Sequence, residues 1–340
     1  MVFLIIDCWA DNMKLKFNNE TFLAEDNDGV QVKIDGFGDT DTVEWLDASH
    51  WSPGRYFVSI VDALTSWGYR RGKNIIGAPF DWRKAPRDLN EYYIKLRTMI
   101  EMMYRYNGHS KVIVLGHSMG NPVMNYFYHN YVDQDWKNKF LEAHISLAGA
   151  WGGSTQIIKL FASGYNMDYF RVILPPSALR SMQRSFTSSA LLFPSEKLWK
   201  VNEPLAITPT RNYTINDIKE FFDDIQYPTG FQQYQTTKDS LILDAPGVKV
   251  HCIYGTKVKT AANFTWYKHD FPEYQPDKID YDDGDGTVNI RSLEVCKSWN
   301  KRNNFGKSVQ YYSLNDADHM NILWDQRTIT LLREILYRKD

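Results

Sequence analysis

Apolar residues follow two different spacings along the 340-residue chain. Between residues 89 and 106 they recur three or four positions apart, which predicts an amphipathic helix with one buried face. Two further segments predict helices, at residues 122–131 and 322–337. Short apolar runs bounded by turn residues predict strands, at residues 74–78, 111–115, 143–147, 248–254 and 309–314. The run at 111–115 is β-branched, which is typical of a buried parallel strand.

The middle of the chain lacks this alternation of strands and helices. We interpret the region after residue 150 as a cap that is inserted into an α/β core. The predicted division is a first core part at 1–150, a cap at 151–247 and a second core part at 248–340. A length of 340 residues is long for one simple core, which agrees with a sizeable insertion.

Composition narrows the function classes. The chain is 43% hydrophobic and 24% charged, with a formal net charge of −2, so nothing favours a nucleic-acid partner. The longest early apolar run, residues 2–6, is far shorter than the roughly 20 residues that span a bilayer, and it does not form a signal peptide. Aromatic residues make up 15% of the chain, which indicates either a large aromatic core or a surface that faces lipid.

The strongest local motif is G-x-S-x-G at residues 116–120, directly between a predicted strand and a predicted helix. Such a tight turn projects the Ser118 hydroxyl beyond the carboxyl end of the strand, and small residues flank it where the backbone is crowded. The Met119 N–H, at the start of the helix, is then a predicted donor to an oxyanion. The alternative is a strand–turn–helix connection without chemistry.

A nucleophilic serine needs an imidazole to take its proton and a carboxylate to orient that imidazole. In the α/β-hydrolase fold these partners follow in the order Ser, acid, His. His319 alone lies just after the last predicted strand, whereas His129 falls in a helix and His144 in a strand. We therefore predict an α/β-hydrolase with a mostly parallel sheet, Ser118 as nucleophile and His319 as base. A surface loop histidine is the alternative.

The acid is expected in the glycine-containing loop at residues 281–288. Its tight turns let a carboxylate point inward, but spacing alone does not choose among Asp282, Asp283 and Asp285. A calcium loop is disfavoured because a closing Glu at the twelfth position is not in register. The histidines are scattered without metal-ligand spacing, so we expect no metal and no cofactor.

Cysteines and glycosylation signals point to a secretory route. Cys8, Cys252 and Cys296 are an odd number, so one stays unpaired if the other two are bridged. Three N-x-[ST] sequons occur, at Asn19, Asn212 and Asn263. The missing signal peptide conflicts with this interpretation.

Four segments together resemble the lecithin:cholesterol acyltransferase family: residues 77–83, 118–121, 149–153 and 283–288. Several long motifs in one order are far more specific than G-x-S-x-G alone. Residues 117–121 are more similar to the lysosomal (group XV) phospholipase A2 branch of the family than to the plasma acyltransferase. The resemblance extends over residues 5–336, nearly the whole chain.

The resemblance implies that Asp285 is the triad acid, that Cys252 and Cys296 form a disulfide, and that Asn212 carries a glycan. It implies an enzyme that removes acyl chains from glycerophospholipids at a membrane surface and passes them to water or to a lipid alcohol, such as ceramide or a sterol. We also expect a monomer in a lysosomal or extracellular location.

Specificity is expected to lie in the cap. A set of aromatic side chains is the candidate lining of an acyl groove, with ordinary cap packing as the alternative: Phe161, Tyr165, Tyr169, Phe170 and Phe193. Asp81 and Trp82 are typical of the family and are expected to support the wall of the site.

The amino terminus departs from the family pattern. Family members have a long segment before the position that matches Ile5, with the first core strands, a membrane-binding lid, a partner for Cys8 and the loop that gives a second oxyanion amide. We therefore expect an N-terminally truncated chain with impaired activity. Two alternatives remain open: a lipid-binding relic that lacks the oxyanion loop, and a different serine hydrolase such as a peptidase or neutral lipase.

Overall fold

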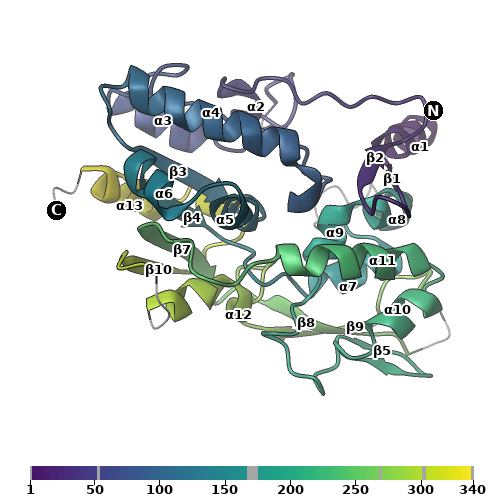
Figure 1. Cartoon of the computed structure of the whole chain (residues 1–340). Helices are drawn as coiled ribbons and strands as arrows, with labels where there is room; N and C mark the ends of the chain where they lie inside the picture. Colours follow the sequence, from purple (N-terminus) through teal and green to yellow (C-terminus); the bar gives the residue numbers. More distant parts are fainter. Residues whose placement is uncertain (1, 52–53, 167–174, 268–269, 301–303, 338–340) are drawn as a thin grey trace.

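A parallel four-stranded sheet forms the centre of the larger part of the molecule (Figure 1). Its order is β10 (Val309–Asn315), β7 (Val250–Thr256), β4 (Leu141–Leu147) and β3 (Val112–His117), and each neighbouring pair is parallel. The computed structural model describes residues 2–51, 54–166, 175–267, 270–300 and 304–337. The sheet and its flanking helices confirm the predicted α/β-hydrolase class, and four of the five predicted strands are present.

The strand β3 lies at the edge of this sheet. In the described part of the chain only β4 lies beside it, and its first four residues are half-buried while the last two are buried. The prediction of a fully buried strand was therefore wrong for residues 112–115. A parallel strand is fully buried only where other elements cover both faces of the sheet, and this cover is incomplete over residues 112–115.

The fifth predicted strand, at residues 74–78, is also wrong. This segment forms turns and a single bridge between Arg71 and Ile75 instead. An apolar run becomes a strand only when another strand pairs with it, and no described strand lies beside this one.

Helices cover the sheet at the predicted places. The helix α4 (Asn90–Tyr106) buries Tyr93, Leu96 and Ile100 against the core, as its spacing predicts. The two other predicted helices are α5 (Gly120–Asn130) and α13 (Gln326–Tyr337). The remaining helices of this part are α2 (Asp41–Glu44), α3 (Val58–Ser66), η2 (Pro86–Asp88), α6 (Gln134–Phe140), α12 (Ile290–Leu293), η4 (Glu294–Asn300) and η5 (Asn321–Leu323).

A second sheet lies at the lower right of Figure 1. It belongs to a region with its own core, which is rich in aromatic side chains. Its order is β6 (Asn212–Tyr213), β5 (Ala206–Ile207), β8 (Thr260–Thr265) and β9 (Lys278–Asp282). The helices of the same region are α7 (Gln156–Ser163), α8 (Pro176–Ser185), α9 (Thr187–Leu191), α10 (Ile218–Asp224), α11 (Pro228–Thr237) and η3 (Lys238–Ser240). Because β8 and β9 follow residue 247, the sheet draws strands from both sides of the predicted cap boundary. The division into domains stays a prediction.

The amino-terminal segment packs on the cap. The helix α1 (Val2–Met13) and the hairpin of β1 (Leu15–Phe17) and β2 (Ala24–Asp26) contact α8. Buried Arg83 connects this segment to the rest of the chain, since its guanidinium contacts both Asp26 and Asp81. Trp82 is half exposed and lies edge-on against Phe186. Asp81 therefore has a structural role in this ion-pair network.

A disulfide joins Cys252 in β7 to Cys296 in η4, as the resemblance implied. Both cysteines are buried in the main core, whereas Cys8 is a free and exposed cysteine. The bridge thus closes a loop of 44 residues between the sheet and the helical segment beside it.

Replacing both bridged cysteines by alanine should lower the free energy of unfolding by about 2–5 kcal/mol, because the unfolded chain regains the entropy of this loop. Denaturant-induced unfolding followed by circular dichroism measures the change. Cys8→Ser is the control and should leave the midpoint unchanged. Equal midpoints for the double variant and the wild type would show that the bridge does not stabilise the fold.

Candidate active site

Ser118 lies on a strained turn between β3 and α5, at the carboxyl edge of the parallel sheet. Its backbone has φ = +51°, a conformation that non-glycine residues rarely adopt. Gly116 leaves room for the Asn121 side chain beside this turn. A Cβ atom at position 116 would lie only 2.8 Å from Asn121 Oδ1. Gly120, by contrast, has open space around it, so crowding does not explain the second glycine of the motif.

The three predicted triad residues lie in one hydrogen-bonded chain. His319 Nε2 is 2.9 Å from Ser118 Oγ, and His319 Nδ1 is 2.7 Å from Asp285 Oδ2. Asp285 and His319 are buried, while Ser118 is half-buried. The structure therefore brings together residues that are separated by as many as 201 positions.

The loop after β9 points the Asp285 carboxylate inward. Its Oδ1 accepts hydrogen bonds from the backbone N–H groups of Thr287 and Val288, at 3.1 and 2.7 Å. Gly286 has φ = +90°, which allows the chain to turn back on itself at this point. With Oδ1 held in this way, Oδ2 is left to face His319. Asp283, a rival on sequence grounds, instead accepts hydrogen bonds from Lys257 N and Gly284 N.

Charge around His319 favours its protonated form. Burial alone would lower the pKa of this imidazole, but the carboxylate of Asp285, by its charge and its hydrogen bond, and the charge of Asp318 raise the pKa above its usual value. An imidazolium that forms when His319 takes a proton is therefore stabilised where it forms.

A second hydrogen-bond network, formed by Asn121, His144 and Tyr128, supports the Ser118 turn. Asn121 Nδ2 donates to the carbonyl oxygens of Ser118 and Leu147, both at 3.1 Å. Its Oδ1 is left to accept from His144 Nε2 at 2.9 Å, so His144 Nδ1 accepts from the Tyr128 hydroxyl at 3.1 Å. Sequence reasoning missed this network, although a polar Asn121 at the buried start of a helix was the available signal.

Met119 follows Ser118 directly and lies at the amino-terminal end of α5. In the described part of the chain its N–H makes no hydrogen bond. The first N–H groups of a helix have no partners within the helix, so this one is available to a ligand. Its role in binding an oxyanion stays a prediction.

The predicted acyl-groove residues lie in the cap core. Phe161 and Phe193 are fully buried, with ring centroids 6.1 Å apart, and both contact Phe222. Tyr165 is buried in the same cluster. This packing gives all three a structural role, and a role in substrate binding stays a prediction. Tyr169 and Phe170 lie outside the described residues.

The three sequons differ in accessibility. Asn19 and Asn212 are exposed. Asn263 is half-buried in β8, between β5 and β9, and its side-chain oxygen is buried. Glycosylation stays a prediction, and the structure is least favourable to it at Asn263.

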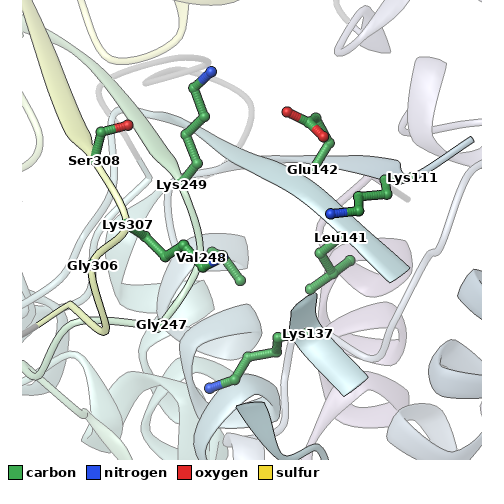
Figure 2. A pocket seen from close by; sticks show the side chains of 10 residues that line it. All are labelled: Lys111, Lys137, Leu141, Glu142, Gly247, Val248, Lys249, Gly306, Lys307 and Ser308. Carbon is green, nitrogen blue, oxygen red and sulfur yellow. The ribbon is translucent and has the colours of Figure 1, made fainter. Parts of the chain in front are cut away.

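A cavity of about 300 Å³ lies at the opposite edge of the sheet (Figure 2). Its lining includes Lys111, Leu141, Lys249 and Ser308, which stand at or just before the first residues of the four parallel strands. Ser118 and His319 follow the last residues of such strands. This lysine-lined cavity is therefore separate from the candidate active site.

A family model described as lecithin:cholesterol acyltransferase matches residues 1–242 and 230–326. The chain belongs to this family. The Ser118, Asp285 and His319 side chains thus occur together in a member of the lecithin:cholesterol acyltransferase family.

Two kinds of relatives illustrate the similarity. Lysosomal phospholipase A and acyltransferase of Homo sapiens is 39% identical over 337 residues, which cover 98% of this chain and 79% of the relative. Phosphatidylcholine-sterol acyltransferase of Rattus norvegicus is 36% identical over 332 residues, which cover 97% of this chain and 73% of the relative. The identity to both relatives extends over nearly the whole chain, in agreement with the match to the family model.

Similarity to solved structures is weaker. The crystal structure of the Tle4–Tli4 complex covers 96% of this chain and 77% of its own, with a TM-score of 0.48 and 11% sequence identity. This likeness says nothing about chemistry.

In the described residues, no three His, Cys, Asp or Glu side chains are grouped so as to hold a metal ion. Over the same residues, no helix combines the length and apolarity needed to cross a bilayer.

The buried His144 predicts a pH-dependent stability. Burial lowers its pKa to about 3, whereas in the unfolded chain the value is near 6.5. The unfolded state therefore binds more protons between these values, and the folded state loses stability as the pH falls from 6.5 towards 3. We expect the unfolding free energy of the wild type to fall more steeply than that of His144→Gln, by up to about 1.4 kcal/mol per pH unit.

Denaturant unfolding at several pH values between 7 and 4 measures this difference. His319 contributes to the pH dependence of the unfolding free energy with the opposite sign to His144. This contribution is the same in the wild type and in His144→Gln, so it cancels when the two are compared. Parallel pH dependences would contradict a neutral His144 in the folded state.

Proposed function

We propose that this chain is a serine acyl hydrolase and acyltransferase that acts on glycerophospholipids through an acyl-serine intermediate. The observation that carries the proposal is the continuous hydrogen-bond chain from Asp285 through His319 to Ser118. Family membership supplies the substrate class, because the relatives are named as phospholipase and acyltransferase enzymes.

In the first step, His319 Nε2 takes the proton of Ser118 Oγ as that oxygen attacks the ester carbonyl carbon. The Asp285 carboxylate keeps the proton of His319 on Nδ1, so Nε2 is free to accept. The Met119 N–H donates to the oxyanion that develops. The ester C–O bond then breaks, His319 returns its proton to the leaving oxygen, and lysophospholipid departs from an acyl-serine.

In the second step, water or a lipid alcohol attacks the acyl-serine. His319 takes the proton of the acceptor hydroxyl, and the ester bond to Ser118 Oγ breaks as that oxygen regains a proton. The products are a fatty acid when water is the acceptor and a new ester when an alcohol is the acceptor. Ceramide and sterols are the alcohols that the family resemblance favours.

The substrate is presented by a membrane surface, and we propose a lysosomal or extracellular location. The name of one group of relatives supports the lysosomal choice. The alternative is a lipid-binding relic without catalysis. The formed hydrogen bond between His319 and Ser118 favours catalysis, because an unused serine needs no aligned base.

A fluorophosphonate probe should label wild-type protein and should not label Ser118→Ala, because only an activated serine reacts with it. The same variant should release no fatty acid from phosphatidylcholine vesicles, while a peptide amide and a triglyceride should be poor substrates for the wild type. Gel fluorescence and mass spectrometry of released fatty acid are the measurements. Equal labelling of the two proteins would refute the assignment of Ser118.

Asp285→Asn tests the orientation of the base. The amide oxygen should take the place of Oδ1 and keep the hydrogen bonds from Thr287 and Val288, so that the amide nitrogen faces His319 Nδ1. This arrangement favours the wrong tautomer, and turnover should fall by roughly 10⁴-fold with little loss of stability.

Asp283→Asn is the matched control, since it removes a charge from the same loop without touching His319. Initial rates of vesicle hydrolysis should separate the two variants. Similar rates for Asp285→Asn and Asp283→Asn would contradict the assignment of Asp285.

A further inference from the structure

His117 precedes Ser118 in the chain and is not part of the triad, yet it contacts the triad directly. Its side chain is 5% exposed. His117 Nε2 lies 2.8 Å from the backbone carbonyl oxygen of His319, and its Nδ1 is hydrogen-bonded to the Tyr56 hydroxyl. The two histidine rings have centroids 4.9 Å apart.

The partners of His117 fix its tautomer. A carbonyl oxygen only accepts, so His117 Nε2 carries the hydrogen and donates to His319. Nδ1 is then without a hydrogen and accepts from the hydroxyl of Tyr56. Burial, together with the neighbouring His319, lowers the pKa of His117 to about 3, so the ring stays neutral while His319 gains and loses its proton.

Asp285 and His117 thereby hold three of the four polar groups of His319. Its backbone N–H donates to the Asp285 carbonyl oxygen at 2.8 Å, its Nδ1 contacts the Asp285 carboxylate, and its carbonyl accepts from His117. Only Nε2 remains, and it faces Ser118. Without the bond from His117, the His319 carbonyl loses its anchor on the side of the molecule that carries Ser118.

We propose that His117 and Tyr56 are positioning residues that hold the catalytic base at its working distance from Ser118. The inference rests on the proposed function and deepens it. Tyr56 orients His117, and His117 in turn holds the backbone of His319. The position of that backbone sets the distance between His319 Nε2 and Ser118 Oγ. Since a displacement of about 1 Å at reacting atoms can cost 10²-fold in rate, this arrangement has a measurable consequence.

A neutral donor also serves the chemistry. A second positive charge on His117 would oppose the imidazolium that forms on His319, because like charges at this distance repel strongly in a buried site. The hydroxyl of Tyr56 donates to Nδ1 and so leaves no need for a proton there. Burial raises the pKa of Tyr56, which keeps it in the donating form.

The test uses three variants of the full chain. His117→Leu removes the donor with a side chain of similar bulk, His117→Gln keeps a terminal N–H that reaches towards the His319 carbonyl, and Tyr56→Phe removes only the hydroxyl. The rate of fluorophosphonate labelling at Ser118 and the steady-state kcat and KM for p-nitrophenyl butyrate are measured, each normalised to the folded fraction.

We expect His117→Leu to lower the labelling rate and kcat by about 10–100-fold with KM within twofold of the wild type. His117→Gln should recover at least a third of the wild-type rate, and Tyr56→Phe should lower the rate about 3–10-fold. Recovery in the glutamine variant separates donation of a hydrogen bond from mere filling of space.

His251→Leu is the matched control. His251 is also a buried strand histidine whose ring lies beside a tyrosine, Tyr312, but it pairs with the amino-terminal part of β10, away from Ser118. This variant should lose stability without a change in the labelling rate of the folded protein.

Wild-type rates in His117→Leu would overturn the inference, as would failure of His117→Gln to exceed His117→Leu. If His117→Leu does not fold, Tyr56→Phe decides, and an unchanged rate in that variant overturns the inference as well. A wild-type protein that does not react at Ser118 refutes the proposed function instead, so the two failures are distinct.

Discussion

The hydrogen bond between His319 Nε2 and Ser118 Oγ is the interaction on which the proposed chemistry depends. Its 2.9 Å length requires that β3 and β10, the two outer strands of the parallel sheet, end at the same edge. It also requires that the loop after β9 turn Asp285 towards the same point. The parallel sheet therefore fixes where the loops of Ser118 and His319 meet, and the second sheet brings the loop of Asp285 to the same place.

Strain and burial are concentrated around this bond. Ser118 adopts an uncommon backbone conformation, and Asn121 stabilises it through two carbonyl oxygens. His117 and His144, both buried and both neutral, each connect a tyrosine hydroxyl to the site. Buried polar networks of this kind stabilise one arrangement of side chains because any unpaired member would be costly.

Sequence patterns predicted the parts of the molecule that depend on local chemistry. The strand–turn–helix around Ser118 and the loop position of His319 follow from short motifs, whereas Asp285 needed a family resemblance because three aspartates share its loop. Tyr56 and His117 were missed as supports because their partners lie in distant segments, up to 202 positions away. Asn121 was missed because its bonds to Leu147 and His144 reach another strand. The strand expected at residues 74–78 failed because pairing depends on a neighbour that no local pattern reveals.

In the proposed mechanism, Ser118 carries the acyl group between donor and acceptor. The most direct measurement is rapid acid quenching of the protein mixed with phosphatidylcholine vesicles, followed by mass spectrometry of its peptides. We predict a peptide that contains Ser118 and is heavier by one fatty acyl group, and we expect this adduct to decay when an alcohol acceptor is added. Release of fatty acid at an undiminished rate by a protein with alanine at position 118, or an adduct on another residue, would contradict this mechanism.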